Sequence, residues 1–146
     1  MTASITRSIE IAAPADDVWA VLEDHASYPE WNPFMVRMQG DWRVGERLEV
    51  DLRSGTGKPM TFKPVVEVAD RARRLRWLGH LWVRGLFDGR HELDLEPVGD
   101  ACTRFTQSES FTGILVGPLR GVIDDAVVGF EAMNRALKER VERDVG

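Results

Sequence analysis

The feature that most constrains the fold is a run of short alternating segments followed by one long amphipathic segment. Between residues 34 and 111, apolar and polar residues alternate in six stretches, and clusters of Gly, Asp and Pro separate these stretches. Such alternation predicts strands with one buried face. The predicted strands are residues 34–39, 46–53, 60–68, 75–81, 86–96 and 103–111.

Another strand and two helical segments are predicted before this run. In residues 5–11 three isoleucines occupy odd positions between polar residues, which indicates a first strand. Pro14 suits the first position of a helix, which we expect to end near residue 24. Residues 28–33 contain two prolines, and each proline disfavours helical geometry in the residue before it. This stretch therefore predicts only a short helical turn.

A single long helix is predicted at the C-terminal end, from about residue 119 to residue 143. Its apolar residues recur every three or four positions, and charged pairs occupy the opposite side. At ~1.5 Å per residue this helix is about 37 Å long, enough to cross a sheet. The element order β-α-α-β6-α predicts an α+β fold, with a curved, seven-stranded antiparallel sheet wrapped round the C-terminal helix.

This arrangement predicts an internal cavity. A strongly twisted antiparallel sheet must cover one face, and one helix covers only a stripe of it. Unless large side chains fill the remainder, a pocket of the usual ~300–1,000 Å³ is left between sheet and helix. The apolar loop at residues 112–118 has glycines at both ends of its apolar part, and we expect it to act as a lid.

Because successive side chains along a strand point to opposite faces of the sheet, the last two strands place three polar residues on the inner face. Those residues are His91, Gln107 and Glu109, and each needs a partner because an unpaired buried polar group costs about 1–3 kcal/mol. A three-residue turn at 99–101 would place Val98 opposite Cys102 and His91 opposite Glu109. A slip of two residues would instead pair His91 with Gln107. The sequence leaves open whether His91 and its partner form a structural pair in the core or a functional pair in a binding site.

Composition excludes several classes of protein. The 146 residues suit one domain, residues 1–146, and a net charge of −5 argues against a nucleic-acid partner. No apolar stretch approaches the ~20 residues of a membrane span, and the first residues lack the apolar core of a signal peptide. The single cysteine cannot form an intrachain disulfide, so we expect a cytoplasmic location. No metal site and no other cofactor are predicted.

Several motifs, spread over essentially the whole chain, are typical of one superfamily. They are Ala13-Pro14 with Val18-Trp19, residues 28–34, Leu75-Arg76-Trp77, residues 85–91 and 103–113, and Gly129-Phe130, Met133-Asn134 and Leu137-Lys138. Through these motifs the sequence resembles the SRPBCC superfamily, which includes START domains, polyketide cyclase/dehydrases and the pollen-allergen-like plant proteins. The resemblance implies the helix-grip fold, with a deep hydrophobic pocket between the sheet and the last helix.

Binding of a small hydrophobic molecule, such as a lipid, polyketide or aromatic compound, is the predicted function. One alternative is a polyketide cyclase or dehydratase in which His91 or Glu109 acts as the acid or base. Another is a protein-interaction module with a filled core. The residues predicted to contact a ligand are Trp31, Phe62, Trp77, Phe87, His91, Phe105, Gln107, Glu109, Phe111, Leu115, Ile123, Val127, Phe130 and Asn134.

Overall fold

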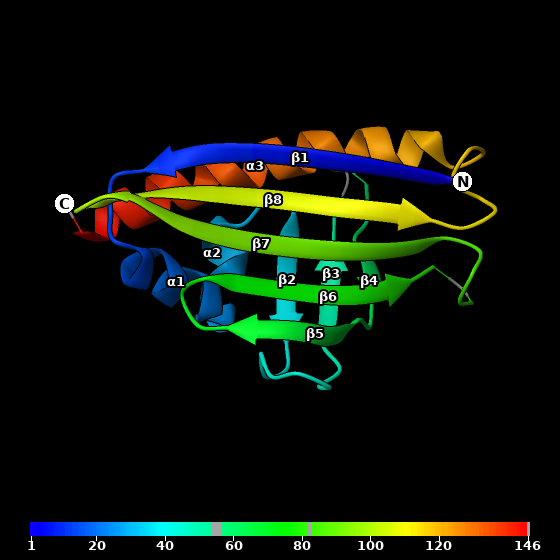
Figure 1. Cartoon of the computed structure of the whole chain (residues 1–146), viewed down its shortest axis with the longest axis horizontal. Coiled ribbons are helices and arrows are strands. Elements are labelled where there is room, and N and C mark those ends of the chain that lie inside the picture. Colours follow the sequence, from blue (N-terminus) through cyan, green and yellow to red (C-terminus); the bar gives the residue numbers. More distant parts are fainter. Residues whose placement is uncertain (54–56, 82, 146) are drawn as a thin grey trace.

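A computed structural model describes residues 1–53, 57–81 and 83–145, and the elements follow the predicted order with one strand more (Figure 1). The strands are β1 (Thr2–Ile11), β2 (Met35–Gln39), β3 (Glu49–Leu52), β4 (Met60–Phe62), β5 (Val65–Asp70), β6 (Arg74–His80), β7 (Asp88–Gly99) and β8 (Cys102–Thr112). The helical segments are α1 (Ala15–Glu23), the 3₁₀ turn η1 (His25–Ser27), α2 (Tyr28–Trp31) and α3 (Arg120–Val145).

These strands form two antiparallel sheets, so the prediction of one seven-stranded sheet is wrong. The large sheet has the order β1-β8-β7-β6-β5, and the small sheet has the order β2-β3-β4. The predicted strand at residues 60–68 is divided because Pro64 has no N–H to donate to a ladder. There the chain leaves the small sheet for the edge of the large one. The Leu48 N–H donates to the Pro64 carbonyl at 2.8 Å and holds this corner together.

The register of β7 and β8 is the predicted one, although the turn between them is not. His91 lies opposite Glu109, as expected. Gly99, rather than Val98, lies opposite Cys102, so the turn has two residues instead of three. An irregularity between Pro97 and Gly99 takes up the extra residue and restores the register beyond it.

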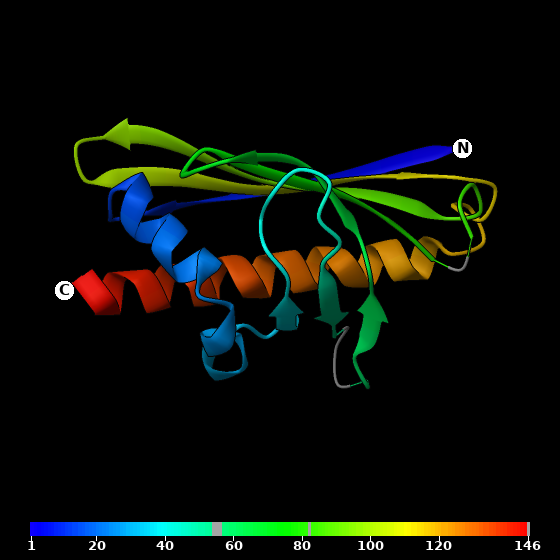
Figure 2. The same cartoon turned by 90° about the horizontal axis from the view of Figure 1, so that it is seen from below.

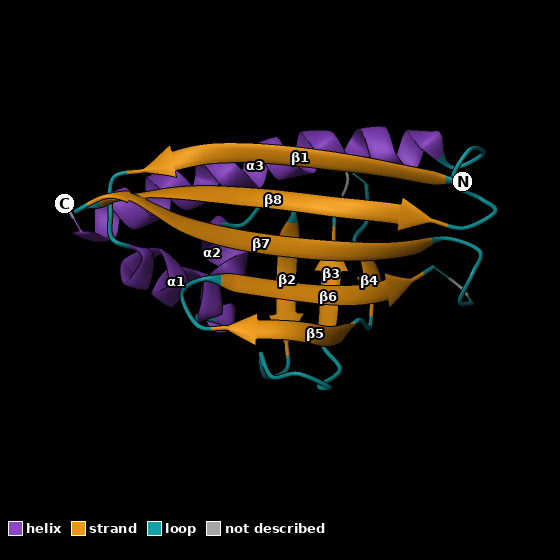
Figure 3. Ribbon diagram, in the orientation of Figure 1, coloured by secondary structure: helices purple, strands orange, loops and turns teal. Residues whose placement is uncertain are grey.

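The large sheet, α3 and the small sheet together enclose the interior (Figure 2). Figure 2 shows α3 and the small sheet on the same face of the large sheet. Figures 1 and 3 show that the strands of the small sheet run across those of the large one, beside α3. The part of the large sheet that α3 leaves uncovered is therefore covered by β2, β3 and β4.

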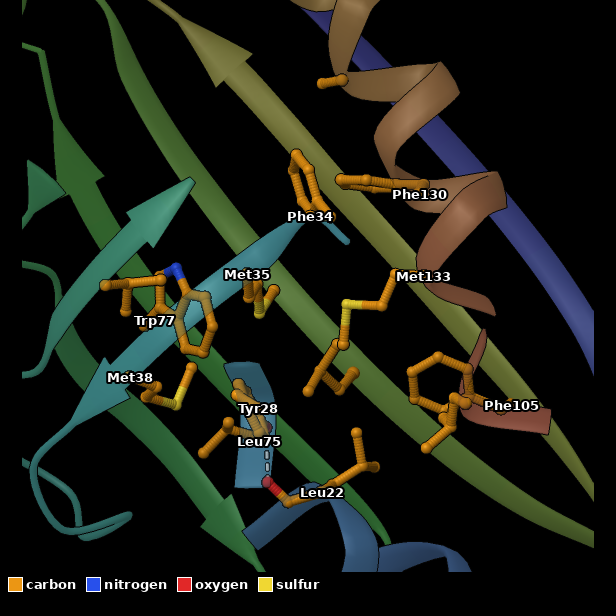
Figure 4. Close-up of a cluster of buried hydrophobic side chains, with 14 of the residues drawn as sticks. Leu22, Tyr28, Phe34, Met35, Met38, Leu75, Trp77, Phe105, Phe130 and Met133 are labelled. Atoms are coloured by element: carbon orange, nitrogen blue, oxygen red, sulfur yellow. Dashed lines mark hydrogen bonds between the residues drawn. The ribbon is translucent and has the colours of Figure 1, made fainter. Parts of the chain in front are cut away.

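Short helices close the far end of the core. Within α1, the side chains of Val18, Trp19 and Leu22 are buried, and Pro14 is the N-cap rather than the first helical residue. The buried Tyr28 hydroxyl donates to the Leu22 carbonyl, as the dashed line in Figure 4 shows. This bond ties α2 to the end of α1 and satisfies a carbonyl that the helix itself leaves unpaired.

The apolar stripe of α3 packs against β1, β8 and α1, as its spacing predicts. Phe130 and Met133 from α3 belong to the same buried cluster as Phe105 from β8 and Leu75 from β6, and Figure 4 draws these side chains. In the part of the chain that the structure describes, no helix is long and apolar enough to cross a membrane.

Candidate functional site

A cavity of about 150 Å³ lies between the large sheet, the small sheet and the N-terminal half of α3. Its lining is mostly apolar, with Lys58, His80, His91 and Glu109 as the ionisable side chains. The volume is below the expected range of about 300–1,000 Å³ and close to that of an engineered apolar cavity that takes up benzene. A space of this size suits a molecule of about one ring.

Two paired glycines open this cavity. Gly79 in β6 lies opposite Gly89 in β7, and both line the cavity. The next pair on the lining face, Trp77 and His91, carries large rings. A Cβ atom added to Gly79 would lie 3.5 Å from Cβ of Pro64, an ordinary contact distance. At this level β6 and β7 therefore contribute no side chain of their own to the floor of the cavity.

A chain of polar side chains starts at the cavity wall and runs into the core. Oε1 of Glu109 lies 3.3 Å from Nδ1 of His91, and Nε2 of His91 lies 3.1 Å from Oε1 of Gln107. Nε2 of Gln107 donates to Oδ1 of Asn134 at 2.8 Å, and Nδ2 of Asn134 donates to the Arg7 carbonyl at 3.3 Å. All three of His91, Gln107 and Asn134 are buried.

The direction of every bond in this chain follows from its last member. The backbone carbonyl of Arg7 can only accept, so Asn134 must turn its NH₂ group toward it and its oxygen toward Gln107. Gln107 then turns its own oxygen toward His91, so Nε2 of His91 must carry a hydrogen. The bond between Nδ1 of His91 and Glu109 needs one further proton, on either atom.

Gly89 provides the space for the Glu109 carboxyl group. A Cβ atom at position 89 would overlap Oε2 of Glu109, so this oxygen lies directly over the Gly89 backbone. Both residues line the cavity, and the Glu109 side chain keeps 15% of its surface exposed. Glu109 therefore contacts His91 with one oxygen and presents the other at the cavity wall.

Aromatic rings hold His91 in place. The Trp77 ring stacks on the imidazole with centroids 4.9 Å apart and planes 19° apart. Phe130 meets the same imidazole edge to face at 5.0 Å. His91 is only 2% exposed, and its ring is packed against two aromatic rings and hydrogen-bonded at both nitrogens. Its orientation is therefore set by the protein and not by a ligand.

A second histidine stands elsewhere on the cavity lining. Nδ1 of His80 lies 2.8 Å from Oδ1 of Asp88, and the Gly85 N–H donates to the same carboxylate. Burial favours the neutral acid, but the hydrogen bonds from His80 and Gly85 outweigh it and lower the pKa of Asp88. Asp88 thus ties the end of β6 to the turn that precedes β7.

Six of the residues predicted to contact a ligand line the cavity. They are Phe62, Trp77, Phe87, His91, Glu109 and Phe111. The other eight lie elsewhere. Phe105, Gln107, Ile123, Phe130 and Asn134 are buried in the core beyond the cavity wall, Leu115 and Val127 are half-buried against the core, and Trp31 faces a surface depression that includes Asp17 and Arg140.

Several lining residues were not predicted. They include Phe34, Val50, Leu52, Met60, Pro64 and Gly79. Most belong to the segments around the small sheet, whose position over the cavity is a tertiary feature. Gly79 and Gly89 could have been found from sequence, because the alternation of side chains along a strand places them on the same faces as Trp77 and His91.

The loop at residues 112–118 follows β8 and is bonded to its neighbours. The Gly113 N–H donates to the Met1 carbonyl at 3.3 Å, and the Leu115 N–H donates to the Leu86 carbonyl at 2.9 Å. Leu115 does not line the cavity. The role of this loop as a lid stays a prediction.

A two-sheet α+β fold with one long helix and an apolar cavity defines a structural class of small proteins with an internal cavity. The chain belongs to the family described as "Polyketide cyclase / dehydrase and lipid transport", whose model matches residues 2–143. Membership of the SRPBCC superfamily, as predicted from the sequence, is thereby confirmed. Comparison with curated proteins finds no match.

Solved structures share the fold at low sequence identity. The Zhui aromatase/cyclase from Streptomyces sp. R1128 superposes with a TM-score of 0.80 at 16% identity, covering 100% of this chain and 97% of that one. A START superfamily protein from Mycobacterium smegmatis gives 0.74 at 20% identity, covering 96% and 97%. Norcoclaurine synthase from Thalictrum flavum, in complex with dopamine and hydroxybenzaldehyde, gives 0.72 at 18% identity, covering 98% and 88%.

Proposed function

We propose that this protein binds a small, mainly apolar molecule of about one ring in the cavity over Gly79 and Gly89. The observation that carries the proposal is a mostly apolar cavity with a carboxyl group at its wall. Protein interiors are normally close-packed, so a cavity of about 150 Å³ is a feature that packing alone does not require. Few, well-placed polar groups in an apolar pocket are typical of small-molecule sites.

The structural neighbours support this proposal without naming the ligand. One shares the fold and is described in complex with two small molecules, dopamine and hydroxybenzaldehyde. The family description names lipid transport beside cyclase and dehydrase activity. Binding of a small molecule in an internal cavity is compatible with the small-molecule complex, with lipid transport and with cyclase or dehydrase activity.

Filling the cavity is the direct test. We expect wild-type protein to bind 4-ethyltoluene, an apolar single-ring probe, and Gly79→Leu to weaken that binding at least about tenfold, because a leucine side chain would occupy the space above β6. The dissociation constant is measured by ligand-observed NMR.

Gly121→Leu is the matched control for this test. Gly121 lies in α3 with no atom within 4 Å of an added Cβ, and it does not line the cavity. This variant should bind 4-ethyltoluene as the wild type does. Equal affinity in Gly79→Leu and wild type, or no binding of the probe by wild type, would contradict the proposal.

Acid–base catalysis, such as cyclisation or dehydration of a polyketide-like carbonyl compound, is the second candidate. The proton between Nδ1 of His91 and Oε1 of Glu109 favours it, because this proton lies at the cavity wall. If it is correct, Glu109→Gln should lower kcat by about 100-fold or more at unchanged KM. Under the binding proposal, wild-type protein should leave such a compound unconverted in a chromatographic assay. The cavity disfavours the third sequence interpretation, a filled core.

A further inference from the structure

Oε2 of Glu109 is the polar atom at the level of the two paired glycines. Oε1 is occupied by His91, and Oε2 lies over Gly89, which lines the cavity. Among the residues that the structure describes, none makes a hydrogen bond to Oε2. A polar atom in a largely apolar space is best satisfied by a group on whatever occupies that space.

The hydrogen-bond chain behind Glu109 decides what Oε2 can do. Nε2 of His91 is a donor to Gln107, so only one proton is shared between Nδ1 and Oε1. When that proton is on Nδ1, Glu109 is a carboxylate and Oε2 accepts hydrogen bonds. When it is on Oε1, pointing at Nδ1, Oε2 is the carbonyl oxygen of a carboxylic acid and again accepts.

Oε2 is therefore an acceptor wherever the shared proton lies. We infer that the molecule bound in this cavity presents a hydrogen-bond donor, a hydroxyl or an N–H group, to Oε2 of Glu109. Its remainder is a small planar ring, because the space measures about 150 Å³ and has Phe62, Trp77 and Phe111 in its wall. This ligand class presupposes the proposed function, binding of a small molecule in the cavity.

Three probes of nearly equal size test the inference on the wild-type protein. 4-Ethylphenol carries a donor, 4-ethyltoluene has a methyl group in its place, and 4-ethylanisole has an oxygen that can only accept. A hydrogen bond is worth about threefold in affinity with a neutral acceptor and about tenfold or more with a charged one, so we expect 4-ethylphenol to bind at least about threefold more tightly than either of the others. Dissociation constants are measured by ligand-observed NMR.

Two glycine variants link this preference to Glu109. Gly89→Ala would displace the carboxyl group, because the new methyl group overlaps Oε2, and the preference for 4-ethylphenol should fall to about twofold or less. Gly79→Ala places a methyl group at the same level of β6, away from Glu109. Because the added methyl group only reduces the cavity volume, Gly79→Ala should weaken the binding of all three probes by a similar factor. The ratio of their dissociation constants should therefore stay as in the wild type.

Each outcome decides between the inference and the function on which it rests. Equal binding of the three probes by wild type overturns the donor inference and leaves the cavity as a binding site. Failure of all three to bind overturns both. If either glycine variant does not fold, the wild-type comparison still decides. Tighter binding of 4-ethylanisole than of 4-ethylphenol would assign a donor, not an acceptor, to the cavity wall and would overturn the inference.

Discussion

Asn134→Asp is expected to destabilise the protein by about 3 kcal/mol or more at neutral pH. Asn134 donates from Nδ2 to the Arg7 carbonyl and accepts from Gln107. A carboxylate would keep the second bond but would turn an oxygen toward the carbonyl of Arg7, in a site that is 3% exposed. The measurement is chemical denaturation of variant and wild type at several pH values.

The loss of unfolding free energy caused by Asn134→Asp should increase as the pH rises. Burial beside a carbonyl raises the pKa of the new carboxyl group in the folded protein above its value in the unfolded chain. Below the unfolded pKa the group is protonated in both states and can donate to Arg7, so the charge penalty is absent. The penalty grows as pH rises above that value. The difference from wild type should therefore be larger at neutral than at acidic pH.

Asn32→Asp is the matched control, because Asn32 is equally buried but uses only its oxygen. Oδ1 of Asn32 accepts from the N–H groups of Phe34 and Met35 at 3.0 and 2.9 Å. A carboxylate preserves both bonds, so we expect a loss of about 1 kcal/mol or less. Similar losses in the two variants would show that the direction of the hydrogen-bond chain at Asn134 is not as derived.

Gly129→Ala is expected to destabilise the fold by about 1–3 kcal/mol, although alanine favours helices more than glycine does. The added Cβ would overlap the ring of Phe34, which packs edge to face on Phe130 with centroids 5.5 Å apart (Figure 4). Since Phe34 also lines the cavity, its displacement should weaken binding of 4-ethyltoluene as well. Thermal unfolding should show a fall in Tm of roughly 2–4 °C per kcal/mol for a chain of this size.

Gly121→Ala makes the same change in the same helix without a neighbour to displace. No atom lies within 4 Å of the added Cβ, so stability should be unchanged or rise by up to about 1 kcal/mol. A Gly129→Ala protein as stable as Gly121→Ala, with unaltered probe affinity, would mean that Phe34 can move aside at no cost.

Local patterns determined the elements, the strand register and the inner faces. Alternation with period two placed His91, Gln107 and Glu109 on one face, and the structure pairs His91 with Glu109 across β7 and β8 as expected. The apolar stripe on the C-terminal helix likewise faces the core, where Phe130 and Met133 are buried. These features follow from geometry that repeats within a few residues, so the sequence carries them directly.

Only the tertiary structure decided where along those faces the cavity lies. The alternation of side chains along a strand predicts which face of the sheet a residue occupies. It does not predict whether α3 or the small sheet packs over that part of the face. Phe105 and Phe130 are inside yet lie in packed core, whereas Gly79 and Gly89 open the cavity because they meet across two strands. The hydrogen-bond direction that makes Oε2 of Glu109 an acceptor also needs a contact between α3 and β1. It starts at the carbonyl of Arg7, 127 residues from Asn134 in the chain, and no local pattern encodes a bond over that distance.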